Sequence, residues 1–199
     1  MFFLYICRVS SQSIDKQKEI LAAALKLFAA YGFHGTPTSK IAKEAGVANG
    51  TLFHYYKTKE DLIVSLYLDI KIRMSAHVED HAKIGKNVKD NFKSQYVQVL
   101  LWSLQNKDEF QFLQQFTASP YAALISPEMM QEQLKKTCAQ IEDAIMQKAI
   151  KKRQPEFILS LFTSHTFGLN HYLIKTDLKA EEQEQTIKES FEMLWAMLS

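Results

Sequence analysis

Cysteine, glycine and proline are all scarce in this chain of 199 residues, which contains two, six and four of them respectively. Cys7 and Cys138 are too few for a disulfide framework and lack the spacing of metal ligands, a pattern typical of a reducing cytoplasm. With so few turn-forming residues, a sheet protein with many tight turns is disfavoured and long helices are favoured.

Long hydrophobic runs and targeting signals are missing too. The apolar run at the start, MFFLYIC, has seven residues, whereas a membrane-spanning helix needs roughly 20. A secretory signal would place basic residues before a longer apolar segment. We therefore expect a cytoplasmic protein without a membrane partner. We expect residues 1–13 to be a loosely packed extension, or the product of a start codon placed too early.

Catalytic and metal-binding motifs are also missing from the sequence. It has no glycine-rich phosphate loop, no nucleophile motif and no convincing pair of carboxylates, so we predict no catalytic residues, no enzyme activity and no cofactor. His77 and His81 have a spacing that a metal could bridge on a helix, but the order of the HExxH motif is absent. A solvated helix end explains both histidines, and we predict no metal site.

Basic charge is concentrated in the first third of the chain. Residues 1–62 contain eight Lys or Arg and five Asp or Glu, within a net charge of +2 for the whole sequence. An excess of this size points only weakly to a polyanionic partner, because solvated surfaces often carry as much.

Apolar residues, 47% of the sequence, recur at helical spacing throughout. No alternation typical of strands is visible, so the predicted fold class is all-α. The predicted helices span residues 15–31, 38–45, 49–56, 59–77, 88–105, 108–119, 127–150, 155–175 and 180–198.

The second and third predicted helices are short and are joined by a turn at Gly46. Thr38 is a plausible N-cap for the first of them. Two short helices with a glycine turn and a longer supporting helix predict a helix-turn-helix, whose last helix can lie in the DNA major groove. On a helical wheel Leu52 and Tyr56 share the inner side. The opposite side consists of Gly50, Thr51 and His54, with Phe53 and Tyr55 at its edges.

The segment TSKIAKEAGVANGTLFHYYKTKEDL, residues 38–62, resembles the DNA-binding signature of the TetR family. The preceding AYGFHGT, residues 30–36, is similar to that family's turn after its first helix. The resemblance covers about residues 15–65, and the remainder matches the family only in its helical architecture. It implies a DNA-binding domain at residues 14–60, followed by an effector-binding and dimerisation domain at residues 61–199.

The resemblance also implies roles for single residues. Thr38 and Ser39 would contact phosphate, although Thr38 could be a cap alone; Tyr55 and Lys59 would contact phosphate as well. Base edges would face Asn49, Gly50, Thr51, Phe53 and His54. The chain departs from the family where Asn49 replaces a common lysine, Phe53 a common tyrosine and Tyr56 a common phenylalanine. The operator sequence therefore cannot be taken from a relative.

A small effector is a further implication of the resemblance, and helical bundles often enclose such ligands. We predict an apolar or aromatic effector. The candidate contacts, for each of which ordinary core packing is the alternative, are Tyr96, Trp102, Phe112, Phe116, Tyr121, Phe162 and His165.

The last two helices are the predicted dimer interface. The helix at 155–175 is apolar on most faces, and the final helix carries one apolar stripe, so two copies could pair in a four-helix bundle. The predicted interface residues are Phe157, Leu161, Leu169, Tyr172, Ile187, Phe191, Leu194 and Leu198. A two-fold dimer would present two recognition helices to palindromic half-sites of double-stranded DNA.

The sequence thus predicts a ligand-responsive transcriptional regulator, a repressor released from its operator by an effector. The alternative is a DNA-bound tethering protein whose helical C-terminal domain binds a protein partner.

Overall fold

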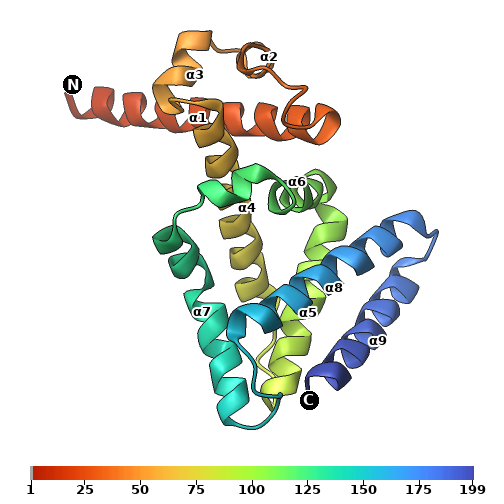
Figure 1. The fold of residues 1–199 in the computed structure, drawn as a ribbon. Coiled ribbons are helices and arrows are strands. Elements are labelled where there is room, and N and C mark those ends of the chain that lie inside the picture. The colour runs from red at the N-terminus through yellow and green to blue at the C-terminus, as the bar shows by residue number, and fades with distance from the viewer. Residues whose placement is uncertain (1) are drawn as a thin grey trace. The chain divides into compact units, whose positions relative to one another are not determined.

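A computed structural model describes the backbone of residues 2–199 and the side chains of residues 15–199, except those of Met130 and Gln133. The described chain contains helices and no strand, which confirms the all-α fold class (Figure 1). The helices are α1 (Phe2–Tyr31), α2 (Thr38–Glu44), α3 (Asn49–Tyr55), α4 (Lys59–His81), α5 (Val88–Gln105), α6 (Lys107–Thr117), a 3-10 helix η1 (Pro120–Leu124), α7 (Pro127–Met146), α8 (Pro155–Lys175) and α9 (Ala180–Leu198). None of the described helices is both long and apolar enough to cross a membrane.

Several helix ends differ from the sequence prediction. Helix α1 begins at Phe2 instead of residue 15. The expected loose packing of residues 1–13 concerns side chains outside the described ones and stays a prediction. Helix α7 ends at Met146 instead of residue 150, because Lys148 has a left-handed backbone with φ of 56° and no glycine signals this turn. Helix α6 ends two residues early, before η1.

The chain forms two compact units. Unit 1 consists of the described residues up to Lys71 together with Asp108–Ile125, and unit 2 consists of Ile72–Lys107 and Ser126–Ser199. By packing, unit 1 therefore includes α6 and η1 in addition to the predicted DNA-binding segment. The functional division at residue 60 stays a prediction.

Unit 1 has an aromatic core that joins distant parts of the sequence. The ring of Phe33 lies 5.3 Å from that of Phe28, 5.5 Å from that of Phe112 and 5.1 Å from that of Tyr121, measured between centroids. These edge-on contacts connect the end of α1 to α6 and η1, a geometry that aromatic pairs prefer. The core thereby fixes the end of α1, on which α2 is supported.

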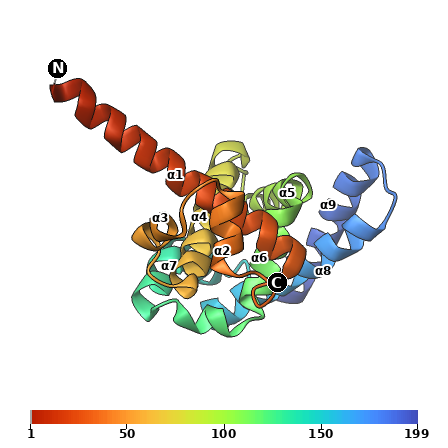
Figure 2. The ribbon, with the colours of Figure 1, turned by 90° about the horizontal axis from the view of Figure 1, so that it is seen from above.

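The turn between α1 and α2 is stabilised by its own hydrogen bonds. Gly32 has φ of +68°, a conformation that glycine adopts at little cost at the end of a helix. The buried hydroxyl of Thr36 donates to the Gly32 carbonyl at 2.9 Å and lies 3.2 Å from the Leu27 carbonyl. Helix α2 then packs against α1 and beside α3 (Figure 1 and Figure 2).

Unit 2 is built around α5, α8 and α9, which pack against one another. Its fully buried side chains include Leu100 of α5, Ile158 of α8 and Phe191 of α9. A buried polar pair lies in the same unit, where the Asn170 amide donates to the Ser103 hydroxyl at 2.8 Å. Both residues are almost completely buried, so the pair must stay matched to avoid an unsatisfied polar group.

Gly35 and Gly50 give a matched test of backbone packing in unit 1. A Cβ added at Gly35 would lie 2.5 Å from the carbonyl oxygen of Tyr31, whereas one at Gly50 would meet no atom within 4 Å. We predict that Gly35→Ala lowers the free energy of unfolding by about 1–3 kcal/mol, and that Gly50→Ala does not lower it. Urea denaturation followed by circular dichroism measures both. Equal stability of the two variants would contradict this packing.

Candidate nucleic-acid interface

Helix α3 has one side held in the core of unit 1. Leu52 is completely buried and Tyr56, the residue that ends the helix, is 3% exposed. This confirms the inner side predicted by the helical wheel and the core role of Tyr56. A helix of two turns buries one side only, so its remaining side chains must face outward.

The outward side of α3 carries the predicted contact residues. Asn49, Gly50, Phe53 and His54 are exposed, while Thr51 and Tyr55 are half-buried. The rings of His54 and Tyr55 meet edge-on with centroids 5.4 Å apart. The outward side therefore offers an amide, a backbone without a side chain, a phenyl ring and an imidazole within two helical turns.

A sharp turn sets the direction of α3. Gly46 has φ of +65°, and the Val47 amide donates to the Ala42 carbonyl at 3.0 Å. Glycine tolerates this left-handed conformation, which most side chains disfavour. The end of α2 is also tied to α1, because the Lys26 ammonium donates to the Glu44 carboxylate at 2.5 Å. This charge-assisted contact holds the pKa of Glu44 below its usual value.

The start of α2 differs from the prediction. Pro37 is the N-cap, and Thr38 is the first helical residue, so the assignment of Thr38 as N-cap is wrong. Proline has no backbone N–H and fits the extended conformation found there. Thr38 and Ser39 lie in the first turn of α2, half-buried and exposed respectively. Their contacts with phosphate stay predictions.

Lys59 has a structural contact that the sequence did not indicate. Its ammonium group donates to the Phe33 carbonyl at 2.5 Å, between the start of α4 and the end of α1. A reciprocal capping arrangement starts α4: the Asp61 amide donates to the Thr58 hydroxyl and the Thr58 amide donates to the Asp61 carboxylate, both at 3.0 Å. Lys59 therefore fastens the turn after α1, and its phosphate contact stays a prediction.

Basic residues accompany the outward side of α3. Lys57 follows the helix directly and is exposed, and Lys40 and Lys43 are exposed on α2. The ammonium of Lys40 lies 3.5 Å above the centre of the Tyr31 ring. Sequence reasoning did not single out Lys40, Lys43 or Lys57, although the basic excess of residues 1–62 was the available signal. These cations suit a phosphate backbone.

A short outward-facing helix, a glycine turn and a supporting helix define a helix-turn-helix DNA-binding protein. Residues 20–66 match the family model described as bacterial regulatory proteins of the tetR family. The crystal structure of a TetR family transcription regulator from Shewanella sp. PV-4 is similar with a TM-score of 0.84 and 26% identity, covering 92% of this chain and 97% of that chain. The helix-turn-helix part of the chain is therefore of the TetR type, and the transcriptional regulators to which it is similar act by binding DNA and not by catalysis.

Two curated relatives match a smaller part of the chain. The fatty acid metabolism regulator protein of Bacillus subtilis (strain 168) is 37% identical over 79 residues, which cover 40% of this chain and 41% of that protein. The HTH-type transcriptional regulator RutR of Escherichia coli (strain K12) is 41% identical over 74 residues, which cover 35% of each protein. The chain thus spans less than half the length of either relative in these matches.

The seven candidate effector contacts are divided between the two units. Phe112, Phe116 and Tyr121 belong to unit 1. Phe112 and Phe116 are fully buried there among other rings, which makes them core residues. Tyr96, Trp102, Phe162 and His165 belong to unit 2. Two surface pockets of unit 2 are lined by other residues.

A polar cluster of unit 2 contains two of the candidates. The Tyr96 hydroxyl lies 2.8 Å from Nδ1 of His165 and 3.4 Å from the Ser190 hydroxyl, which in turn lies 3.4 Å from Nε2 of His165. Burial raises the pKa of Tyr96 to about 12 and lowers that of His165. Both side chains are therefore neutral hydrogen-bonding groups near pH 7. Ser190, on α9, was missed because a lone serine carries no sequence signal.

The predicted dimer interface is wrong for the residues of α9. Ile187, Phe191, Leu194 and Leu198 are at most 5% exposed, because they pack in the core formed with α5 and α8 of the same chain. On α8, Phe157 and Tyr172 are 52% and 51% exposed, and Leu161 and Leu169 are half-buried. The exposed apolar side chains of α9 are Met193 and Met197.

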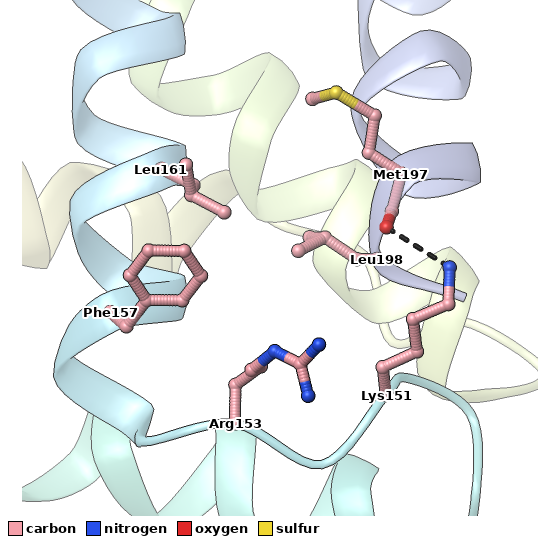
Figure 3. A pocket seen from close by; sticks show the side chains of 6 residues that line it. All are labelled: Lys151, Arg153, Phe157, Leu161, Met197 and Leu198. Atoms are coloured by element: carbon pink, nitrogen blue, oxygen red, sulfur yellow. Dashed lines mark hydrogen bonds between the residues drawn. The ribbon is translucent and has the colours of Figure 1, made fainter.

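A surface pocket of about 270 Å³ lies at the start of α8. Phe157, Leu161, Met197 and Leu198 form its apolar walls, and Lys151 and Arg153 approach from the preceding loop (Figure 3). The Lys151 ammonium donates to the Met197 carbonyl at 3.3 Å. The pocket therefore belongs to the apolar surface at the start of α8 and the end of α9. It shares no lining residue with the Tyr96 cluster.

His77 and His81 lie at the end of α4, where their rings stack with centroids 4.1 Å apart. Nδ1 of His81 is 2.8 Å from the His77 carbonyl. In the part of the chain with described side chains, no group of three or more metal-ligating residues is found.

The role of Lys59 can be tested against its neighbour Lys57. Removing the Lys59 ammonium leaves the Phe33 carbonyl with only the longer hydrogen bond from the Thr36 amide, at 3.4 Å, so we predict that Lys59→Ala lowers the free energy of unfolding by about 1 kcal/mol. The exposed Lys57→Ala should change it by less than about 0.5 kcal/mol. Denaturant titration of both variants provides the measurement, and indistinguishable midpoints would rule out the fastening role.

Proposed function

We propose that this TetR-family regulator is a homodimeric repressor that leaves a palindromic operator when a small effector binds. The observation that carries the proposal is the exposed side of α3, held outward by buried Leu52 and Tyr56 within the family match at residues 20–66. In the proposed complex this side lies in the major groove, and Lys57 and the α2 lysines contact phosphates.

The effector proposed here has an apolar or aromatic body and at least one hydrogen-bonding group. Support comes from the Tyr96, His165 and Ser190 cluster, which takes one side chain each from α5, α8 and α9. The Phe92 and Phe162 rings pack beside each other in the same unit, with centroids 5.7 Å apart. The B. subtilis relative, whose name refers to fatty acid metabolism, matches 40% of this chain.

Release from DNA is proposed to be a shift between two populations of the dimer. An effector with higher affinity for the state whose α3 helices do not fit adjacent major grooves would favour that state. Helix α4 is the proposed connection, because residues 59–71 belong to unit 1 and residues 72–81 of the same helix to unit 2.

The proposed dimer interface is the exposed side of α8, with Met193 and Met197 of α9. Phe157, Leu161, Leu169 and Tyr172 remain the proposed contacts on α8, and the exposed methionines replace the buried residues of α9. Gly168 shares the side of Phe157 and Tyr172 by helical spacing, and it is exposed with no atom within 4 Å of an added Cβ. A tethering protein would use the same apolar side for another protein.

Base readout can be measured on a duplex selected from a random pool by the full chain. We predict that His54→Ala or Thr51→Ala reduces discrimination between this duplex and random DNA by 10-fold or more, because each removes a group facing base edges. Lys57→Ala should weaken binding to both duplexes similarly and reduce the number of ions released on binding by about two, one for each protomer of the proposed dimer. Fluorescence anisotropy at several salt concentrations measures these constants. Unchanged discrimination in His54→Ala and Thr51→Ala would contradict the proposed face.

Dimerisation can be tested at Gly168. A large charged side chain there is tolerated by a single chain but not by a packed interface, so we predict that Gly168→Arg is monomeric and binds the selected duplex at least 10-fold more weakly. Gln131→Arg, which adds the same charge at an exposed position of α7, should remain dimeric. Sedimentation equilibrium and circular dichroism measure assembly and folding. A folded, dimeric Gly168→Arg protein would exclude this interface and favour the tethering alternative for that surface.

A further inference from the structure

Phe53 is the apolar element of the outward side of α3. It is 37% exposed, although it lies next to the buried Leu52. The ring of Tyr31, also exposed in unit 1, is covered by the Lys40 ammonium, and the ring of His54 packs against that of Tyr55. Among the described side chains, no ring contact is found for Phe53. Its phenyl group therefore remains open to whatever α3 contacts.

The chemistry of a phenyl ring narrows what it can recognise. In the major groove, base pairs present hydrogen-bond acceptors, hydrogen-bond donors and one apolar group, the C5 methyl of thymine. Phenylalanine neither donates nor accepts a conventional hydrogen bond, so polar edges gain nothing from its approach and lose water. Only the methyl group is stabilised by contact with the ring, through removal of apolar surface from water.

We propose that Phe53 reads a thymine in each operator half-site by packing its ring against the C5 methyl. The inference rests on the proposed function, because it requires α3 to lie in the major groove. It also gives a physical meaning to the departure from the family at this position: a tyrosine hydroxyl could bond to a polar base edge or a phosphate, and Phe53 lacks that group.

A second exposed residue, Asn49, can also produce a preference for A·T pairs. The experiment must therefore distinguish its contribution from that of Phe53. Asn49 lies one helical turn before Phe53 and is exposed, and an asparagine amide can pair with N6 and N7 of adenine. An A·T preference in a selected sequence therefore does not identify the residue that reads it. Deoxyuridine separates the two, because an A·U pair keeps adenine N6 and N7 and lacks only the methyl group.

The experiment measures binding of the full chain to duplexes in which each half-site thymine is replaced in turn by deoxyuridine. Replacing one particular thymine of a half-site by deoxyuridine should weaken binding about four-fold, which is the effect of removing one methyl-sized group from a buried contact. Replacing both symmetric positions should give roughly 15-fold weaker binding in the dimer, if the two half-sites contribute independently. With a C·G pair at that position, 5-methylcytosine should bind more tightly than cytosine, because it returns the methyl group to the same place.

Variants assign the effect to Phe53. Phe53→Ala should bind the thymine and deoxyuridine duplexes equally, since the ring that senses the methyl is gone. Lys57→Ala is the matched control: it should weaken binding to both duplexes and keep the four-fold ratio. Circular dichroism establishes that each variant is folded, which is expected for two exposed positions.

Each other outcome overturns the inference. A half-site without thymine, or insensitivity to deoxyuridine at every thymine, would show that no methyl is read. A deoxyuridine effect that persists in Phe53→Ala would assign the methyl contact to another residue. Failure of the full chain to select any sequence is a different result, because it would remove the proposed function itself.

Discussion

The burial of Leu52 and Tyr56 against the rest of unit 1 is the constraint on which the functional surface depends. Helix α3 has seven residues, so once these two positions are fixed in the core, the direction of every other side chain follows from helical geometry. The turn at Gly46 sets the direction of α3. The Lys26–Glu44 contact ties α2 to α1, and the Lys59–Phe33 hydrogen bond ties the start of α4 to the turn after α1. Stability and recognition are therefore coupled in this unit: the core residues do not touch DNA in the proposed complex, yet they aim the residues that do.

The sequence was sufficient to predict this local arrangement for a physical reason. The spacing of Leu52 and Tyr56 reports directly on which side of a helix is buried, and Gly46 reports on the turn before it. What the sequence could not show were contacts between distant segments. The Lys59 ammonium meets a carbonyl 26 positions away, and no periodic pattern encodes such a contact. The cap of α2 was misplaced by one residue because threonine is a common N-cap and Pro37 offers no side-chain hydrogen bond.

Unit 2 shows where periodicity stops being informative. The apolar stripe of α9, formed by Ile187, Phe191, Leu194 and Leu198, was wrongly assigned to a dimer interface, because a stripe does not reveal whether its cover comes from the same chain or from a partner. Here α5 and α8 provide it. The aromatic candidates behaved in the same way. Spacing marked Phe112 and Phe116 as inward-facing, whereas their assignment to the core of unit 1 depends on packing with α1 and α4. The Tyr96, His165 and Ser190 cluster depends on three separate helices and was only partly foreseen.

The central claim is that the exposed side of α3 reads a specific DNA sequence as part of a symmetric dimer. Selection of binding duplexes from a random pool by the purified full chain, followed by sequencing, tests this claim most directly. The account predicts a palindrome whose half-sites are centred about one helical turn apart, or a multiple of it, as two major-groove helices related by a two-fold axis require. Enrichment of no sequence, or of a single asymmetric site, would contradict it.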